Sequence, residues 1–310
     1  MTPTIIVVGS LNMDLVVRAP RHPQPGETLI GSDFQTFPGG KGANQAVAAA
    51  RLGARVRMIG RVGVDAFGET LLAAAQHDGV DTTFVQRDPD APTGVALITL
   101  DAQGQNTIVV APGANMRVSE ADVERAEAIF AGADALLMPL ECPLTAVMAA
   151  TRLARKHGVK VILNPAPAQP LPIDLLAQLD YLVPNQPELQ TLAEGETDVA
   201  KATEYVRRQG VKSVVVTQGE AGAMLVSDDH TTQVPAFHVP VVDTVAAGDA
   251  FVAAFCVALA EGKTPLEAVR WGNAAGALTV TRSGAQPSLP SRMEVVRLLE
   301  VQSGNNAPLH

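Results

Sequence analysis

Residues 241–255 read VVDTVAAGDAFVAAF, and this stretch organises the interpretation of the whole chain. Val241 and Val242 end an extended run, and residues 243–248 are small and turn-prone. After Asp249, apolar side chains recur at helical spacing, at Phe251, Phe255, Ala258 and Leu259. The pattern predicts that a helix begins at Gly248 and Asp249.

A helix start built from small residues is an anion site, because its first N–H groups have no internal partner and the dipole favours negative charge. Asp249 would repel a bound phosphate. It fits better as a base that takes a proton from a hydroxyl group attacking the phosphate. From these residues alone, a simple capping role for Asp243 or Asp249 is an equally good interpretation.

The bulk composition describes a globular chain and excludes several classes of function. Of 310 residues, 47% are hydrophobic and 18% charged, and the formal net charge of −9 argues against nucleic acid and anionic membranes as partners. The chain has no run of about 18 apolar residues and no signal-peptide pattern. Two distant cysteines and six scattered histidines predict no disulfide and no transition-metal centre, and favour a cytoplasmic protein.

Most of the chain alternates strands and helices, which predicts a largely parallel sheet with helices on both faces. We interpret residues 1–310 as one domain with a frayed tail from about Gln302. The predicted strands are 5–8, 56–60, 135–138, 161–163, 181–183 and 213–217. The predicted helices are 43–52, 67–78, 119–130, 143–157 and 198–209, with two more opened by capping signals at 264–267 and 291–294.

Four short strands come without helices between them, at 15–17, 28–30, 93–100 and 107–110. Residues 101–105 (DAQGQ) predict a hairpin between the last two. We interpret segments of about 12–37 and 92–112 as a small, mostly antiparallel flap added to the main sheet.

Residues 38–44 (PGGKGAN) form a second glycine-rich helix start that lets a ligand approach the backbone. It is not a Walker A loop, since positions 35 and 42 are Gln and Gly, and no G-x-G-x-x-G follows a strand.

Polar residues also follow several strands, where ligands bind in open α/β sheets. They are Asn12, Asp14, Glu141, Asn185, Glu188 and the 217–222 turn. A shared cleft is favoured over isolated loop residues, and Glu188 near a phosphate would hold Mg²⁺.

Four of these segments in this order resemble the ribokinase-like sugar kinases. They are GSLNMD at 9–14, GGKGANQAVAAARLGA at 39–54, the N-x-x-E at 185–188, and DTVAAGDAF at 243–251. The resemblance runs from about Ile5 to Leu299. It implies a three-layer, doubly wound α/β fold with a small β-sheet lid, and ATP-dependent phosphorylation of D-ribose at its 5-hydroxyl.

The resemblance also implies roles for single residues. Asp249 is then the catalytic base, and the amides of Ala246, Ala247 and Gly248 form the anion hole. Sugar-binding positions are matched by Asn12, Asp14, Gly40, Lys41, Asn44 and Glu141. ATP-binding positions are matched by Asn185, Thr217, Gly219, Gly222, Gly248 and Asn273, and the Mg²⁺-linked position by Glu188. A K⁺ site of mainly backbone oxygens is matched by Asp243, Val245, Thr279, Arg282, Gly284 and Ser288.

The sequence departs from the family pattern next to the proposed base. Ala250 and Val252 stand where Thr and Asn are common, and Gln186 stands where an acidic residue is common. These differences leave open a kinase for 2-deoxyribose, a ketohexose or a nucleoside, and changed Mg²⁺ handling. A non-catalytic sugar sensor is disfavoured because Asp249 is present. The open edges and apolar face of the flap predict a homodimer in which the two flaps pack together and each covers one sugar site.

Overall fold

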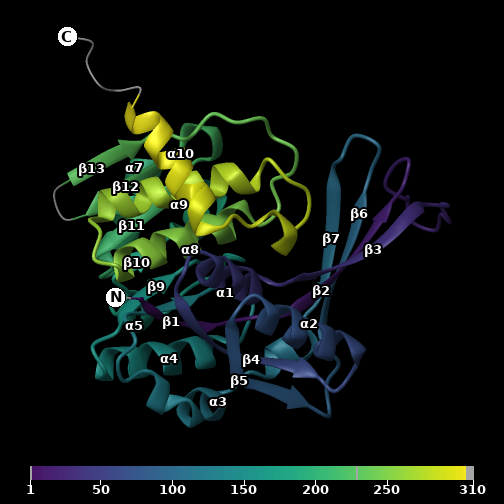
Figure 1. Cartoon of the computed structure of the whole chain (residues 1–310), viewed down its shortest axis with the longest axis horizontal. Coiled ribbons are helices and arrows are strands. Elements are labelled where there is room, and N and C mark those ends of the chain that lie inside the picture. The colour runs from purple at the N-terminus through teal and green to yellow at the C-terminus, as the bar shows by residue number, and fades with distance from the viewer. Residues whose placement is uncertain (1, 228–229, 305–310) are drawn as a thin grey trace.

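A nine-stranded sheet forms the centre of the described chain (Figure 1). The structure is a computed structural model that describes residues 2–227 and 230–304. The strand order is β13-β12-β11-β10-β9-β8-β1-β4-β5. Pairing is parallel from β5 to β11, and β12 and β13 add antiparallel at one edge. The bounds are β1 Thr4–Val8, β4 Arg55–Gly63, β5 Val80–Asp88, β8 Ala135–Met138, β9 Lys160–Leu163, β10 Tyr181–Leu182, β11 Ser213–Thr217, β12 Ala223–Ser227 and β13 His230–Val234.

Helices cover both faces of this sheet, and the central strand β1 shows why. Its side chains alternate, so Ile5 and Val7 enter one buried cluster while Ile6 and Val8 enter the other. The first cluster includes α1 (Lys41–Arg51), α2 (Ala66–His77), α8 (Ala247–Ala260), α9 (Pro265–Thr279) and α10 (Arg292–Gly304). The second includes α3 (Glu120–Arg125), α4 (Leu144–Lys156), α5 (Ile173–Leu176), α6 (Gln186–Leu192) and α7 (Val199–Arg208). This is the expected three-layer α/β fold.

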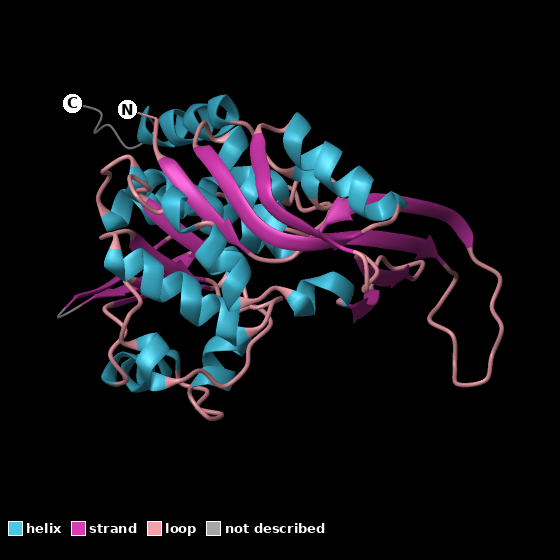
Figure 2. Cartoon of the chain, turned by 90° about the horizontal axis from the view of Figure 1, so that it is seen from below, coloured by secondary structure: helices cyan, strands magenta, loops and turns pink. Residues whose placement is uncertain are grey.

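A second sheet of four strands extends away from the main body (Figures 1 and 2). Its order is β3-β2-β6-β7, with bounds β2 Asn12–Arg18, β3 Ser32–Gly39, β6 Gly94–Leu100 and β7 Asn106–Ala111. Only β2 and β6 pair in parallel. The predicted hairpin is confirmed, because the Asp101 amide donates to the Gln105 carbonyl at 2.9 Å. We call these four strands the lid sheet.

Several local predictions were wrong. Residues 28–30 form no strand, since β3 begins at Ser32. Residues 119–130 divide into α3 and a 3₁₀ turn at Glu127–Ile129. Val241 and Val242 lie in irregular backbone. β5, β12, β13 and α6 were not predicted. β5 is an edge strand with a mixed polar sequence, VDTTFVQRD, that carries no clear period.

Helix starts were predicted more reliably, because a capping residue and its partner lie within a few positions of each other in the sequence. The predicted capping box at Ser119 and Asp122 is present, as is that at Thr264 and Glu267. At Ser291, the backbone N–H and the hydroxyl both donate to Glu294 at 2.8 Å. α10 continues to Gly304, past the predicted tail start at Gln302, and residues 305–310 of that tail lie outside the described chain.

Candidate active site

The N-terminus of α8 carries an open backbone site. Ala246 precedes the helix in the left-handed conformation, with φ 61°, and turns the chain into it. Among the described residues, the amides of Gly248 and Asp249 have no acceptor, as expected for a first helical turn. A Cβ built on Gly248 would meet nothing within 4 Å. This helix start can therefore accept an anion against its backbone.

Asp249 lies in that first turn and is nearly buried. Both carboxylate oxygens accept hydrogen bonds from consecutive side chains of α1. Asn44 donates through Nδ2 to Oδ2 at 3.0 Å, and Gln45 donates through Nε2 to Oδ1 at 3.0 Å. The predicted helix starts at residues 40–44 and 248–249 therefore meet, although they are 205 positions apart.

Glycines bring α1 this close to the first strand. Gly40 has φ 87°, a conformation that L side chains rarely adopt. A Cβ on Gly42 would lie 2.4 Å from the Ser10 amide nitrogen. Close packing of α1 on the turn after β1 thus requires glycine at position 42.

Glu141, after β8, joins the same turn to α1. Its Oε2 accepts from the Ser10 hydroxyl at 2.5 Å and from the Lys41 backbone amide at 3.0 Å. The pKa of the Lys41 side chain is raised by the negative charge of Asp249, against the opposing effect of burial, with further contributions from Glu141 and Glu188. Lys41 is therefore a firmly cationic group among carboxylates.

Asn12 and Asp14 lie within β2 of the lid sheet, on the same face. Burial raises the pKa of Asp14 to about 7, and the nearby Glu141 and Asp249 carboxylates add to the increase. Gly39 of β3 pairs with Asn12, and a Cβ on Gly39 would lie 2.4 Å from Asp14 Oδ2. Asp14 can thus change protonation state near neutral pH.

Asn115, which the sequence did not single out, fixes this end of β2. Its Nδ2 donates to Asn12 Oδ1 at 2.7 Å and to the Leu11 carbonyl at 3.0 Å, while its Oδ1 accepts from the Leu11 amide at 2.9 Å. It comes from a 3₁₀ turn, Gly113–Arg117, just after the lid sheet. No local pattern around Asn115 indicates this role.

Asn185 and Glu188 cap α6 reciprocally. The Asn185 amide donates to Glu188 Oε2 at 2.9 Å, and the Glu188 amide donates to Asn185 Oδ1 at 2.8 Å. Burial is the main cause of the raised pKa of Glu188, opposed by the Asn185 bond and by Lys41, while Asp249 raises it further. Asn185 also forms a parallel bridge with Thr217 at the end of β11.

The 217–222 turn and Asn273 both approach the Val234 carbonyl at the end of β13. Gly222 has φ 92°, and a Cβ there would lie 2.1 Å from the Val234 carbonyl oxygen; Gly219 also has positive φ, at 57°. Asn273, on α9, donates to the carbonyls of Val234 and Pro235, both at 3.1 Å. The Asn273 amide is therefore already engaged in holding β13 against α9.

Asp243 ties the loop before α8 to the segment after α9. Its Oδ1 accepts from the Val245 amide at 3.0 Å and its Oδ2 from the Gly284 amide at 2.9 Å. The Val242 amide donates to the Val280 carbonyl at 2.7 Å. The remaining predicted cation-site residues lie in or beside this segment, with Thr279 and Ser288 buried and Arg282 paired with Glu294. In the described residues, no group of three or more His, Cys, Asp or Glu could hold a metal ion.

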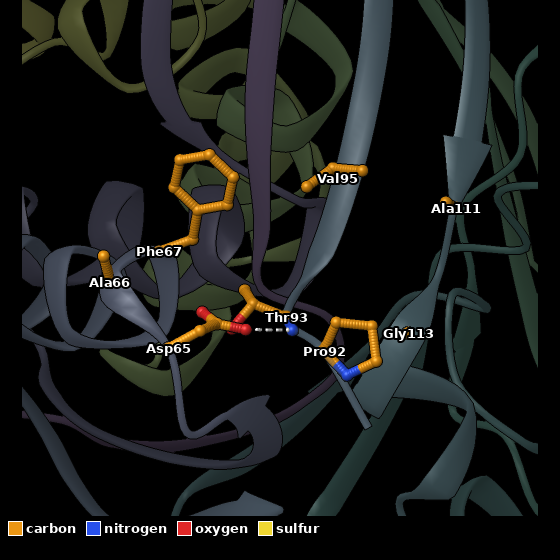
Figure 3. Close-up of a pocket in the computed structure, with 8 residues that line it drawn as sticks. All are labelled: Asp65, Ala66, Phe67, Pro92, Thr93, Val95, Ala111 and Gly113. Atoms are coloured by element: carbon orange, nitrogen blue, oxygen red, sulfur yellow. Dashed lines mark hydrogen bonds between the residues drawn. The ribbon is translucent and has the colours of Figure 1, made fainter. Parts of the chain in front are cut away.

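A hollow of about 460 Å³ lies away from this cluster, at the root of the lid sheet (Figure 3). It is mostly apolar, and Phe67 of α2 and Val95 of β6 lie above a hydrogen bond in which the Thr93 amide donates to Asp65 at 2.8 Å. None of the predicted site residues lines it. Of the described helices, none is long and apolar enough to span a membrane.

The fold and the polar cluster between α1, β2 and α8 define a carbohydrate kinase of the ribokinase fold. The chain belongs to the pfkB family of carbohydrate kinases, whose family model matches residues 2–292.

Relatives of known name cover nearly the whole chain. A ribokinase of Haemophilus influenzae is 43% identical, over 97% of this chain and 99% of its own. A deoxyribokinase of Salmonella typhi is 36% identical, over 93% and 95%. The structure of Arabidopsis thaliana ribokinase complexed with ribose and ATP matches with a TM-score of 0.89 at 37% identity, over 97% and 99%.

Proposed function

We propose that this kinase transfers the γ-phosphoryl group of ATP to the 5-hydroxyl of D-ribose. One observation carries the proposal: a buried carboxylate, Asp249, is held on both oxygens at a helix start where the Gly248 and Asp249 amides have no acceptor among the described residues. A base and an anion site side by side are what phosphoryl transfer to an alcohol requires. The relatives named ribokinase support ribose as the sugar.

In the proposed reaction, Asp249 takes the proton of the 5-hydroxyl as its oxygen attacks the γ-phosphorus. The amides of Ala246, Ala247 and Gly248 stabilise the charge on the transferring group, and the Ala247 amide must first leave the Thr244 carbonyl, to which it donates at 3.3 Å. The bond between the γ-phosphorus and the oxygen that bridges it to the β-phosphate breaks, and ADP leaves with that oxygen.

The sugar would be held by Asn12, Asp14, Gly40, Lys41, Asn44 and Glu141. Their donors and acceptors suit a neutral polyol, and Asn44 Oδ1 is a buried acceptor with no partner among the described residues, free for a sugar hydroxyl. ATP would contact Asn185, Thr217, Gly219, Gly222, Gly248 and the vicinity of Asn273.

Two cations complete the proposal. Glu188 has one carboxylate oxygen in its helix cap and one without a bond in the described chain, which suits Mg²⁺ held through water. Mg²⁺ would neutralise phosphate charge. K⁺ would bind main-chain oxygens near Asp243, Val245, Thr279, Arg282, Gly284 and Ser288 and steady the loop before α8. Asp243 already bridges the two segments through both oxygens, which suits that role.

The proposal is tested by ADP release with ribose as the acceptor. Asp249→Ala and Asp249→Asn should each lower kcat by at least about a thousand-fold, since the base is lost while the fold is kept. Near-normal turnover by either variant would rule out the mechanism. The relative named deoxyribokinase makes 2-deoxyribose the second candidate. A higher kcat/KM for 2-deoxyribose than for ribose would replace the proposed substrate.

We further propose one kinase domain over residues 1–310, with the lid at about 12–37 and 92–112 forming a homodimer. In the strand register, Leu15, Leu97 and Val109 share one face of the lid sheet, opposite the face of Asn12 and Asp14. Leu97 is 50% exposed and Val109 65%. Val95 and Ala111 continue this face into the hollow of Figure 3. Such a surface favours a second copy as its cover.

A further inference from the structure

Gln45 is the most deeply buried polar group that touches Asp249. Its side chain is fully buried, yet its Nε2 makes two hydrogen bonds, to Asp249 Oδ1 and to Asn164 Oδ1, each at 3.0 Å. Its Oε1 has no partner among the described residues. A buried acceptor without a partner carries a free-energy cost, so the orientation of this amide must be enforced by its neighbours.

Asn164 is the neighbour that fixes the orientation of the Gln45 amide. It follows β9 directly, and its Nδ2 donates to the Val183 carbonyl at 2.9 Å. A backbone carbonyl can only accept, so Asn164 must turn its amide nitrogen to Val183 and its oxygen to Gln45. Backbone bonds on both sides hold Asn164 in place: its amide donates to the Met138 carbonyl at 2.9 Å, and the Ala166 amide donates to its carbonyl at 2.8 Å.

The bond from Asn164 to the Val183 carbonyl therefore fixes the direction of every hydrogen bond in the series from Val183 to Asp249. If the Gln45 amide were reversed, its oxygen would face two acceptors, Asn164 Oδ1 and Asp249 Oδ1, and both bonds would be lost. With Asn164 fixed, Gln45 can present only N–H to the carboxylate. A donor at that oxygen stabilises the ionised form of a carboxylate, which is the form that can take a proton.

We propose that Gln45 and Asn164 form a positioning relay that holds the Asp249 carboxylate in a fixed orientation, aimed for proton removal. This inference rests on the proposed role of Asp249 as base. The relay leaves Oδ2, which Asn44 contacts, as the oxygen on the sugar side, because Gln45 has no exposed surface and cannot itself touch a substrate. Gln45 and Asn164 are therefore positioning residues rather than catalytic ones.

The test is the pH dependence of kcat in variants of the full-length enzyme. Gln45→Met keeps the length of the side chain but removes the donor. Its kcat should fall about ten-fold at neutral pH. The acid limb of its profile, the pH range in which kcat falls on acidification, should move up by about one pH unit. The KM for ribose should stay within about two-fold of the wild-type value, since Gln45 does not reach the sugar. Gln45→Glu should move the limb further, because it places a second carboxylate there.

A double-mutant cycle tests the relay itself. Asn164→Leu should shift the limb in the same direction, and adding it to Gln45→Met should change nothing more, because the relay is already broken. Thr151→Val, a buried change on α4, is the control and should leave the profile unmoved. If Gln45→Met fails to fold, Gln45→Leu with Asn164→Leu provides the same cycle, because leucine also removes the donor without adding a charge.

Other ionisable groups near Asp249 must be separated from this effect. Those that interact with it are Lys41 on α1, Asp14 on β2 and Glu188 on α6. A shift that persists in an Asp14→Asn background belongs to the relay. An unmoved acid limb in Gln45→Met, or additive losses in the cycle, would overturn the relay. If Asp249→Asn kept its turnover, the proposed function would fail instead.

Discussion

At the scale of a single residue, Asp14 should make the stability of the protein depend on pH. Burial, with Glu141 and Asp249 nearby, raises its pKa from 3.8 to about 7. The folded protein therefore binds this proton more tightly than the unfolded chain does. The stability that this proton contributes is complete below about pH 4 and is lost as pH rises to about 7.

Asp14→Asn removes that loss. The difference in free energy of unfolding between Asp14→Asn and wild type should grow, in favour of the variant, by roughly 2–4 kcal/mol from pH 4 to pH 8. It should change little at higher pH. Urea unfolding at several pH values measures this, and parallel curves for the two proteins would contradict it. If Asp14 contacts the sugar as proposed, the variant should also bind ribose more weakly, because the carboxyl group becomes an amide.

Asp88 offers a control of opposite sign. It is also buried, which by itself would raise its pKa, but bonds from the Asp90 amide, Arg61 and Arg117 outweigh burial and lower the pKa. Its contribution to stability is therefore present above about pH 4 and lost in acid. Asp88→Asn should destabilise the protein at pH 7, by an amount that shrinks as the pH falls.

At the scale of an element, two glycines on the packed helices α8 and α9 should behave in opposite ways. Gly248→Ala has room for its Cβ, and alanine suits a helix better, so stability should stay equal or rise by about 0.5–1 kcal/mol. The methyl group would, however, enter the proposed anion hole, and kcat should fall by at least about a hundred-fold.

Gly272→Ala provides the contrast. A Cβ at Gly272 would lie 2.8 Å from the ring of Phe251, so α9 must shift away from α8. Thermal unfolding should show a clear loss of stability for Gly272→Ala and none for Gly248→Ala. A Gly248→Ala protein with normal turnover would count against a phosphate at this helix start.

The elements also show what the sequence could and could not predict. Helix starts such as those at Ser119 and Thr264 were predictable because a capping residue and its partner are three positions apart. The contact from Asn115 to Leu11 spans 104 positions, and that from Gln45 to Asn164 spans 119. Such contacts depend on the order of strands in the sheet, in which β8 and β4 flank β1, and no local pattern encodes that order.

At the scale of the whole molecule, the lid sheet belongs to both the proposed sugar site and the proposed dimer. Asn12 and Asp14 project from one of its faces, while Leu15, Leu97 and Val109 share the other. The outer part of this apolar face, at Leu97 and Val109, would be left in water in a monomer. If a second copy covers it, dimerisation also fixes how β2 is presented to the sugar.

Leu97→Asp should therefore break the dimer and weaken sugar binding together. A charge at the centre of an apolar interface costs several kcal/mol, so the variant should sediment as a monomer at micromolar concentration, with KM for ribose raised about ten-fold. Ile108→Asp is the matched control, because Ile108 is about as exposed, at 49%, but lies on the opposite face of the same hairpin. It should stay dimeric. A wild-type protein that sediments as a monomer would rule out the dimer, and dissociation by Ile108→Asp alone would assign the interface to the sugar-facing side of the lid.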